Sequence, residues 1–510
     1  MRSRPGAWRY VVGPFAVAAL AWLAYAPILG AYFRHDDFWW LSTARQWADG
    51  ALPLTHAPAG VAPLYSLLYD FLYRTFGLNP QPYFASLLLC HVLDSCLVLA
   101  LVWLLTRRYL AGLTGGLLFA LLFCHHEAVA WPAGGPHVFA LTGILLALIC
   151  WVVYRRGHRW GLPLAVLCAL AAIFTKDSGI AVIPLLLALD LAGFPRERRW
   201  PLAWLALPVV ALAAWRVLIP PIAEPMRPGS PSFHLGLHSL WNLIHNPPQM
   251  LVPDLRFENY QQFLGRLLPP GAVGAALLTA RAAILLLSAL AVWAMARGSR
   301  LVKVGALWCY VGFLPFIPFS QHFARAPRYL YIPSIGLALL AGLAALAVSR
   351  RTKPGCSAAR VVAVGLFGLY LVGSFGFARL VCANRLAESA QRRQIMSIVL
   401  QRLPQPEPGA EIVLAGLPVY LQDAAQGLPV LYGRPVAVRI SRGPVKPGAY
   451  WFTFDEASPG RLIGFSGPSR PTPAASGHRT PPGPPGTPIP VRGPAAGHGS
   501  RPASPVPARR

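Results

Sequence analysis

Charged residues are scarce in this chain, and acidic ones are the scarcest. Only 12% of its 510 residues are charged, with 18 Asp and Glu against 45 Lys and Arg. Soluble domains carry about twice that charged fraction. Because 55% of the residues are hydrophobic, the composition excludes a soluble globular domain. The net charge of +27 does not indicate nucleic-acid binding, because the arginines lie mostly between apolar runs or in the C-terminal tail.

Close cysteine pairs are also lacking. The eight cysteines show no metal-ligand spacing, and most lie in apolar runs, where a thiol behaves as a small hydrophobic group. We therefore expect neither a zinc site nor a disulfide framework. No cofactor and no metal ligand set is predicted.

Apolar runs dominate residues 10–382, which we expect to form an all-α polytopic membrane domain over 1–382. A span needs about 20 apolar residues, and the runs predict about eleven transmembrane helices. The first, Tyr10–Gly30, follows a basic start and is interpreted as a retained signal anchor. The other expected spans are 83–105, 109–124, 136–154, 160–175, 179–194, 200–219, 272–296, 304–320, 329–349 and 361–382.

Basic clusters occupy every second connection between these spans, as the positive-inside rule requires of cytoplasmic loops. The prediction is therefore a multi-pass membrane protein with a cytoplasmic N-terminus and an extracytoplasmic C-terminus. Residues 383–453 are expected to form a small extracytoplasmic domain, with a helix over 385–403 and strands near 412–417 and 436–440. Residues 454–510, rich in Pro, Gly and Arg, predict a disordered tail.

The strongest polar motif is Asp36-Asp37, just past the first span in the first outer connection. If the two carboxyl groups are buried together, one has a raised pKa, which suits a general base. The alternative is a helix start in a solvated loop, with Trp39 and Trp40 as interfacial anchors.

Two further outer connections carry charged candidates. His125, His126 and Glu127 end one apolar run, and either bind a metal or phosphate, relay protons, or form a polar helix end. Lys176 and Asp177 form either a turn with a local ion pair or a phosphate-binding pair.

Arg325 and Arg328 lie on the outer side, against the positive-inside trend, which indicates an anionic partner. Within the spans, Asp94 with His91 is either a proton path or an interhelical hydrogen bond. Asp190 is close enough to the following arginines for an interfacial pair.

Taken in order, these motifs resemble the GT-C superfamily of membrane glycosyltransferases. The Asp36-Asp37 pair resembles that superfamily's acidic signature. The stretches HHEAVAWPAGGPHVFAL (His125–Leu141), KDSGIAVIPLLLALD (Lys176–Asp190) and RYLYIPSIG (Arg328–Gly336) are similar to the transmembrane and tetratricopeptide-repeat O-mannosyltransferases and their bacterial relatives. No tetratricopeptide array follows the last expected span.

The resemblance implies an inverting transferase that moves a sugar from a polyprenyl-phosphate-linked donor to an acceptor hydroxyl on the outer face. Either Asp36 or Asp37 would then be the general base. Lys176, Arg325 and Arg328 would hold the donor phosphate, and membrane lipids and an acceptor protein, lipid or glycan would be the partners. The alternatives from the residues are a transporter or flippase of lipid-linked glycans, a polysaccharide polymerase or ligase, and an inactive relative.

Overall fold

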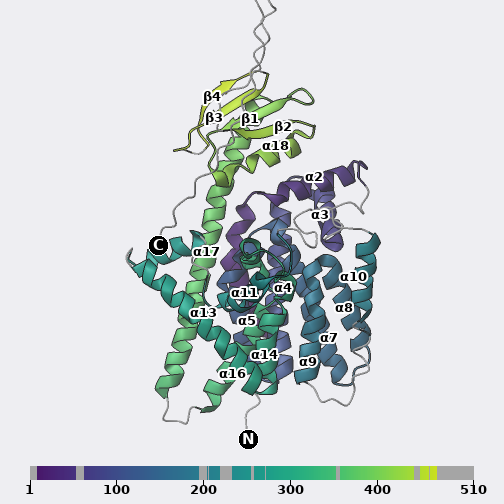
Figure 1. The fold of residues 1–510 in the computed structure, drawn as a ribbon, viewed down its shortest axis with the longest axis vertical. Coiled ribbons are helices and arrows are strands. Elements are labelled where there is room, and N and C mark those ends of the chain that lie inside the picture. Colours follow the sequence, from purple (N-terminus) through teal and green to yellow (C-terminus); the bar gives the residue numbers. More distant parts are fainter. Residues whose placement is uncertain are drawn as a thin grey trace, which may run out of the picture.

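The protein is described here by a computed structural model, which defines residues 9–52, 62–193, 204, 206–218, 232–253, 258–269, 272–351, 357–441, 448–458 and 460–467. Helices make up a tall body, and a small sheet stands above one end of it (Figure 1). Most of the tail predicted to be disordered, from residue 468 onward, lies outside the described residues.

The helical body consists mainly of long apolar helices joined by short polar connections. Their bounds are α1 (Arg9–Tyr25), α4 (Gln81–Thr106), α5 (Tyr109–Leu121), α6 (His126–Val129), α7 (Pro136–Arg155), α8 (Gly161–Thr175), α9 (Val182–Gly193), α10 (Ala206–Leu218), α11 (Leu237–His245), α12 (Glu258–Leu267), α13 (Ala272–Arg297), α14 (Arg300–Val311), α15 (Gln321–Ala324), α16 (Ser334–Arg351) and α17 (Ser357–Arg402).

Each expected span overlaps one of these helices, but not every helix is long enough to cross a bilayer alone. Within the described residues, five helices are sufficiently long and apolar, or six if the bent pair Tyr109–Leu121 and Phe123–Val129 forms one span. Three further helices are apolar but too short to pass this test. Helices α9 and α14 have only 12 residues each. The chain is thus a multi-pass helical membrane protein, while the count of about eleven spans stays a prediction.

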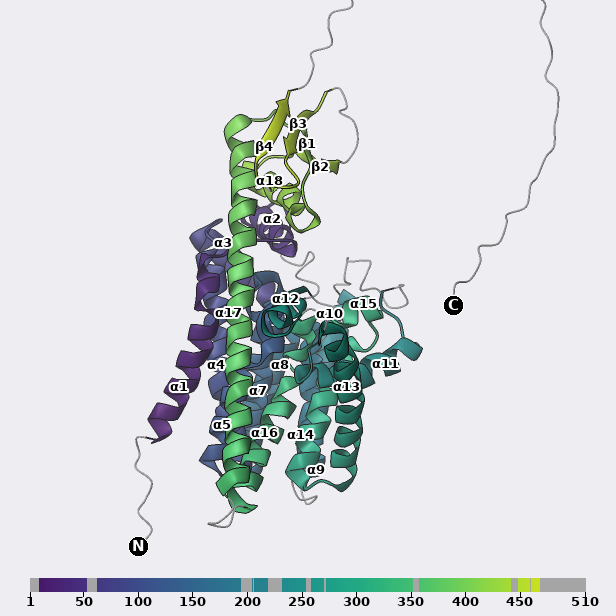
Figure 2. The same cartoon turned by 90° about the vertical axis from the view of Figure 1, so that its left-hand side faces the viewer.

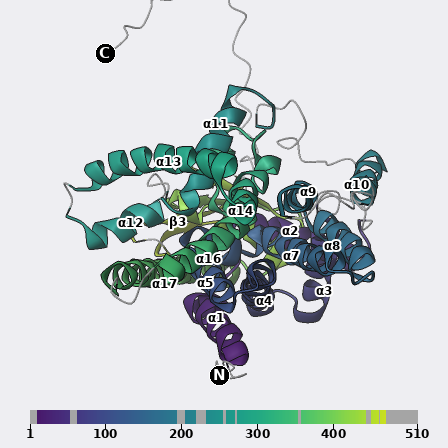
Figure 3. The ribbon, with the colours of Figure 1, turned by 90° about the horizontal axis from the view of Figure 1, so that it is seen from below.

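The two ends of the body differ in what they carry. The long first connection forms α2 (Asp36–Ala48) and α3 (Pro63–Phe76), which lie at the same end as the sheet (Figure 1). Seen from the opposite end, α12 and α13 project to one side, and α8 and α10 lie on the other (Figure 3).

Helix α17 joins the body to the sheet without a break, over 46 residues. It passes alongside α1 (Figure 2). The expected last span and the expected helix over 385–403 are therefore one element.

Among its described residues, the C-terminal unit has a four-stranded sheet with the order β2-β1-β3-β4, together with the helix α18 (Ala424–Tyr432). The strands are β1 (Glu411–Ala415), β2 (Ala437–Ser441), β3 (Tyr450–Phe454) and β4 (Leu462–Ser466). The first two confirm the expected strands, but β3 and β4 were not predicted. Because β4 pairs antiparallel with β3, the predicted boundary at residue 453 was placed too early.

The C-terminal unit shares one hydrophobic core with α2 and α3. Phe38 and Leu41 of α2 belong to the same buried cluster as Ile395 of α17 and Leu428 of α18. At Gly427 the close approach leaves no room for a side chain, because a Cβ atom there would lie 2.8 Å from the Phe38 ring. The sheet and the first outer connection therefore form one packed unit.

Candidate functional site

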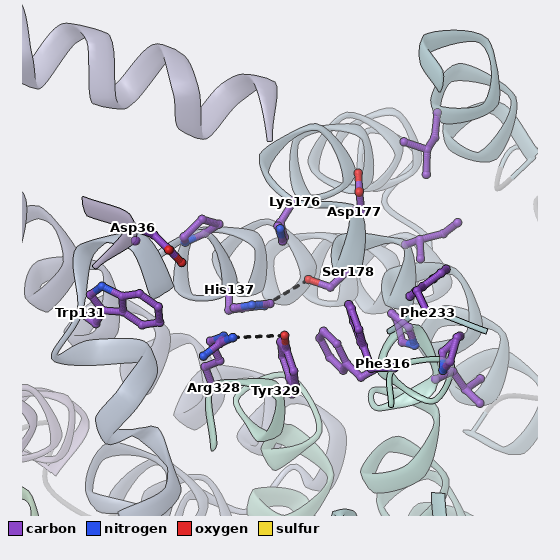
Figure 4. A pocket seen from close by; sticks show the side chains of 18 of the residues that line it. Asp36, Trp131, His137, Lys176, Asp177, Ser178, Phe233, Phe316, Arg328 and Tyr329 are labelled. Carbon is purple, nitrogen blue, oxygen red and sulfur yellow. Dashed lines mark hydrogen bonds between the residues drawn. The ribbon is translucent and has the colours of Figure 1, made fainter. Parts of the chain in front are cut away.

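A cavity of about 510 Å³ lies beneath α2, at the end of the body that carries the sheet. One end of its lining is polar, and Figure 4 shows Asp36, His137, Lys176 and Arg328 grouped there. Phe233 and Phe316 lie on the side away from Asp36 (Figure 4). The lining also includes the apolar side chains Leu212, Leu314, Pro315, Pro318 and Phe319. Such a cavity suits a ligand with a polar head and a hydrocarbon portion.

The two adjacent aspartates lie in the first turn of α2 but have different surroundings. Asp36 lines the cavity, whereas Asp37 is fully buried behind it. The Asp37 carboxylate accepts the backbone N–H of Arg34 at 2.9 Å and of Ala133 at 2.7 Å. Burial raises the pKa of Asp37 to about 7. The sequence prediction that one carboxyl of the pair has a raised pKa thus applies to the one that does not face the cavity.

Arg328 is a cavity cation with a dedicated partner. Its guanidinium pairs with Glu127 at 2.5 Å, and Glu127 also accepts the Arg328 backbone N–H at 3.3 Å. The same guanidinium lies 5.3 Å from the Trp131 ring and 4.8 Å from the Tyr329 ring. Burial by itself lowers the pKa of Arg328, but the charges and hydrogen bonds of Glu127 and Tyr329 together raise that pKa by more. Arg328 therefore stays charged.

Lys176 lies in the connection between α8 and α9, in extended backbone that ends α8. It lines the cavity together with Asp177 and Ser178. The Ser178 hydroxyl and His137 Nδ1, at the start of α7, are 3.2 Å apart. The cavity therefore draws its polar groups from segments far apart in the sequence.

Some of the residues predicted to bind substrate lie outside the cavity lining. His125 is buried, with Nε2 at 2.9 Å from the Ser334 hydroxyl. His126 is also buried, and its Nδ1 is 2.9 Å from the Phe123 carbonyl. Arg325 donates to Gln321 at 3.4 Å, one turn earlier. None of these three side chains lines the cavity that Asp36, Lys176 and Arg328 line.

Arg34 is a buried cation that sequence analysis missed. It is 7% exposed, and its guanidinium lies 4.8 Å from the Trp131 ring. Burial, followed by repulsion from Arg385, lowers the pKa of Arg34 to about 9. Trp131 thus contacts two arginines, Arg34 and Arg328. Trp131, His137, Ser178 and Tyr329 were missed as well, although each lies inside or beside a recognised motif.

The intramembrane acids are engaged in local bonds. Thr142 and Tyr331 donate to Asp94 at 2.6 and 3.1 Å, and His91 Nδ1 is 2.8 Å from the Tyr331 hydroxyl. Asp190 pairs with Arg155 at 3.1 Å. Of the two readings left open for Asp94, the geometry favours the interhelical hydrogen bond. Among the described residues, no group of three or more His, Cys, Asp or Glu side chains is arranged to hold a metal.

Comparison with curated proteins finds relatives among O-mannosyltransferases, while no family model matches. The chain is 28% identical over 193 residues to protein O-mannosyl-transferase Tmtc1 of Drosophila melanogaster, covering 34% of this chain and 22% of that protein. It is 30% identical over 177 residues to protein O-mannosyl-transferase TMTC2 of Mus musculus, covering 32% and 19%. The match spans about a fifth of the length of these relatives. The resemblance predicted from the motifs is thereby confirmed.

Two solved structures are similar along most of this chain. ArnT from Cupriavidus metallidurans, bound to undecaprenyl phosphate, aligns with a TM-score of 0.47 and 15% identity, covering 86% of this chain and 87% of that one. The Archaeoglobus fulgidus oligosaccharyltransferase, in complex with Zn and sulfate, aligns with a TM-score of 0.46 and 11% identity, covering 84% and 62%.

Proposed function

We propose that this chain is a GT-C-type membrane glycosyltransferase that moves a sugar from a polyprenyl-phosphate-linked donor to an acceptor hydroxyl, with inversion. The observation that carries the proposal is the division of the cavity. Asp36 lies near Lys176 and Arg328, whereas Phe233 and Phe316 lie on the other side of the cavity (Figure 4). A phosphate-linked lipid has the matching division into an anionic head and a hydrocarbon chain.

In the proposed reaction the acceptor hydroxyl loses its proton to the Asp36 carboxylate. The acceptor oxygen attacks the anomeric carbon of the donor sugar, and the bond from that carbon to the phosphate oxygen breaks. The bonding electron pair leaves with the phosphate, so the lipid phosphate departs as an anion. No separate general acid is needed, and a single displacement inverts the anomeric centre.

The other polar groups have supporting roles in this reaction. Lys176 and Arg328 stabilise the charge that develops on the leaving phosphate. Glu127 holds the Arg328 guanidinium in place through the 2.5 Å ion pair. Asp37 accepts the N–H of Ala133 and so ties the start of α2 to the segment that carries Trp131.

The proposed setting is a bacterial inner membrane that the chain crosses about eleven times, with the cavity on the extracytoplasmic side. The relatives are named O-mannosyl-transferases, so a mannosyl donor is the first to test. The acceptor is a protein, a lipid or a glycan. Transport of a lipid-linked glycan is less well supported, because Asp94 is occupied by Thr142 and Tyr331.

The test is sugar transfer in membranes that contain the full chain, from a panel of radiolabelled polyprenyl-phosphate sugars. Asp36→Asn is expected to lower the transfer rate by about 10²- to 10⁴-fold, the usual contribution of a general base. Asp37→Asn is expected to lower it less, because Asp37 does not face the cavity.

The matched control is Asp70→Asn on α3, which removes a carboxylate paired with Arg74 at 2.8 Å, away from the cavity lining. Transfer that survives Asp36→Asn at the wild-type rate would remove the proposed base. If wild type transfers no sugar from any donor, the transferase proposal fails, and a lipid translocation assay then tests the transporter alternative.

A further inference from the structure

Asp423, which precedes α18, connects the C-terminal unit to the start of α2. Its side chain is 2% exposed. It accepts a hydrogen bond from Arg392 Nε of α17 at 2.8 Å and another from the backbone N–H of His35 at 2.9 Å. Arg392 is equally buried, with 1% of its side chain exposed. A buried carboxylate thus joins three segments that are distant in the sequence.

His35 has an unusual backbone conformation at this contact. Its φ is 44°, a left-handed value that residues other than glycine seldom adopt. Such conformations persist only where the surroundings hold them. His35 immediately precedes Asp36, so its φ and ψ set the direction in which α2 leaves and where the Asp36 carboxylate points. The bond from the His35 N–H to Asp423 is a restraint on this strained residue.

The far end of α2 is held by the same unit. Arg45 donates to the backbone carbonyls of Val430 at 3.3 Å and Gly433 at 2.9 Å, at the end of α18. Phe38, in the first turn of α2, packs directly against Gly427. Helix α2 is therefore held in its first turn and near its end by residues that lie about 390 positions later in the chain.

We propose that the C-terminal unit positions the catalytic helix, and that Asp423 is the positioning residue for Asp36. This inference rests on the proposed function, because it assigns Asp36 to catalysis. Asp423 itself does not line the cavity, so it acts through His35. The expected signature is a change in the rate of the chemical step rather than in donor binding.

The first experiment is amide hydrogen exchange of the purified full chain, which needs no activity. Asp423→Ala is expected to speed exchange of the amides in residues 35–45 at least tenfold, and to leave exchange in α4 and α7 unchanged. The matched control is Glu411→Gln, which breaks a 3.1 Å ion pair with Arg439 inside the same unit but away from α2. It is expected to leave exchange in residues 35–45 at the wild-type rate.

The second experiment separates kcat from KM in the transfer assay. Asp423→Ala is expected to lower kcat 10- to 100-fold and to change the donor KM less than threefold. Asp423→Asn, whose amide oxygen can still accept the His35 N–H, is expected to recover at least half of the lost activity on a logarithmic scale. Should Asp423→Ala fail to fold, the double variant Asp423→Leu with Arg392→Met takes its place in both experiments, because it removes the acceptor of the His35 N–H and replaces the buried ion pair as a unit.

The outcomes separate this inference from the proposed function. If exchange in residues 35–45 is unchanged by Asp423→Ala, or rises equally in α4 and α7, the positioning role is refuted whatever the activity. If exchange rises only in residues 35–45 but wild type transfers no sugar, the C-terminal unit holds α2 and the proposed reaction is wrong. Equal loss of kcat in Asp423→Ala and Glu411→Gln would also overturn the positioning role.

Discussion

Asp37 gives the sharpest prediction about stability and pH. It is fully buried, and burial raises its pKa from 3.8 to about 7. The folded state therefore favours the neutral carboxyl, while the unfolded chain ionises it near its ordinary pKa. The contribution of this group to stability is fully present below about pH 4 and is lost as the pH rises to about 7.

The size of this effect follows from the two pKa values. Each tenfold change in proton affinity is worth about 1.4 kcal/mol, so a pKa of about 7 instead of 3.8 amounts to roughly 4 kcal/mol. Asp37→Asn removes that dependence. The variant also places an amide NH₂ against one of the two backbone N–H donors, Arg34 and Ala133, at a cost of about 1–3 kcal/mol.

The stability curves of wild type and Asp37→Asn are therefore expected to converge, and to cross, as the pH rises from about 4 to about 7. The assay is thermal unfolding of the purified chain in detergent across this range. Asp70→Asn, a change to an ion-paired carboxylate on α3, is the control and should run parallel to wild type. Parallel curves for wild type and Asp37→Asn would refute the reasoning, because they would show that Asp37 has the same pKa in the folded and the unfolded chain.

Two further substitutions test the site and its main alternative. Arg328→Lys keeps the charge but loses the planar contact with Trp131 and the bond from the second guanidinium nitrogen to the Tyr329 hydroxyl. We expect the donor KM to rise about tenfold, measured by initial transfer rates, and an unchanged KM would argue against phosphate binding there. Asp94→Asn is expected to leave the transfer rate within about threefold of wild type. It is expected to lower the free energy of unfolding by about 1–3 kcal/mol, because the hydrogen bond from Tyr331 is weakened. A transfer rate that falls as far as in Asp36→Asn would restore the interpretation of Asp94 as part of a proton path.

The helical body was largely predictable because a membrane span is recognisable from its local composition. Each expected span overlaps a helix, since an apolar run must satisfy its own backbone hydrogen bonds in lipid. The sheet was only half predicted. Strand β3 (Tyr450–Phe454) is rich in aromatic residues, but β4 follows a turn and contains a glycine. Strand β4 is fixed by its pairing with β3. A pairing between strands cannot be recognised from the local sequence.

The candidate site was predictable as a set of segments but not as individual contacts. Adjacent residues on a helix point about 100° apart, so only one of Asp36 and Asp37 could face a given cavity, yet nothing local showed which. His125 and His126 looked like ligands because histidines at a helix end are polar, and the fold buries both. Arg34 was missed because its partner is an aromatic ring, Trp131, almost a hundred positions away.

The length of α17 has a consequence for how the protein responds to its bilayer. At 1.5 Å per residue, 46 residues extend for about 70 Å, more than twice the hydrocarbon thickness of about 30 Å. A helix adapts to a thicker or thinner membrane chiefly by changing its tilt. Because α17 has no break between its apolar part and Arg392, a change of tilt at one end is carried as a displacement to the other. A mismatch between the helix and the bilayer thickness would thus displace Arg392, and through Asp423 it would act on His35 at the start of α2.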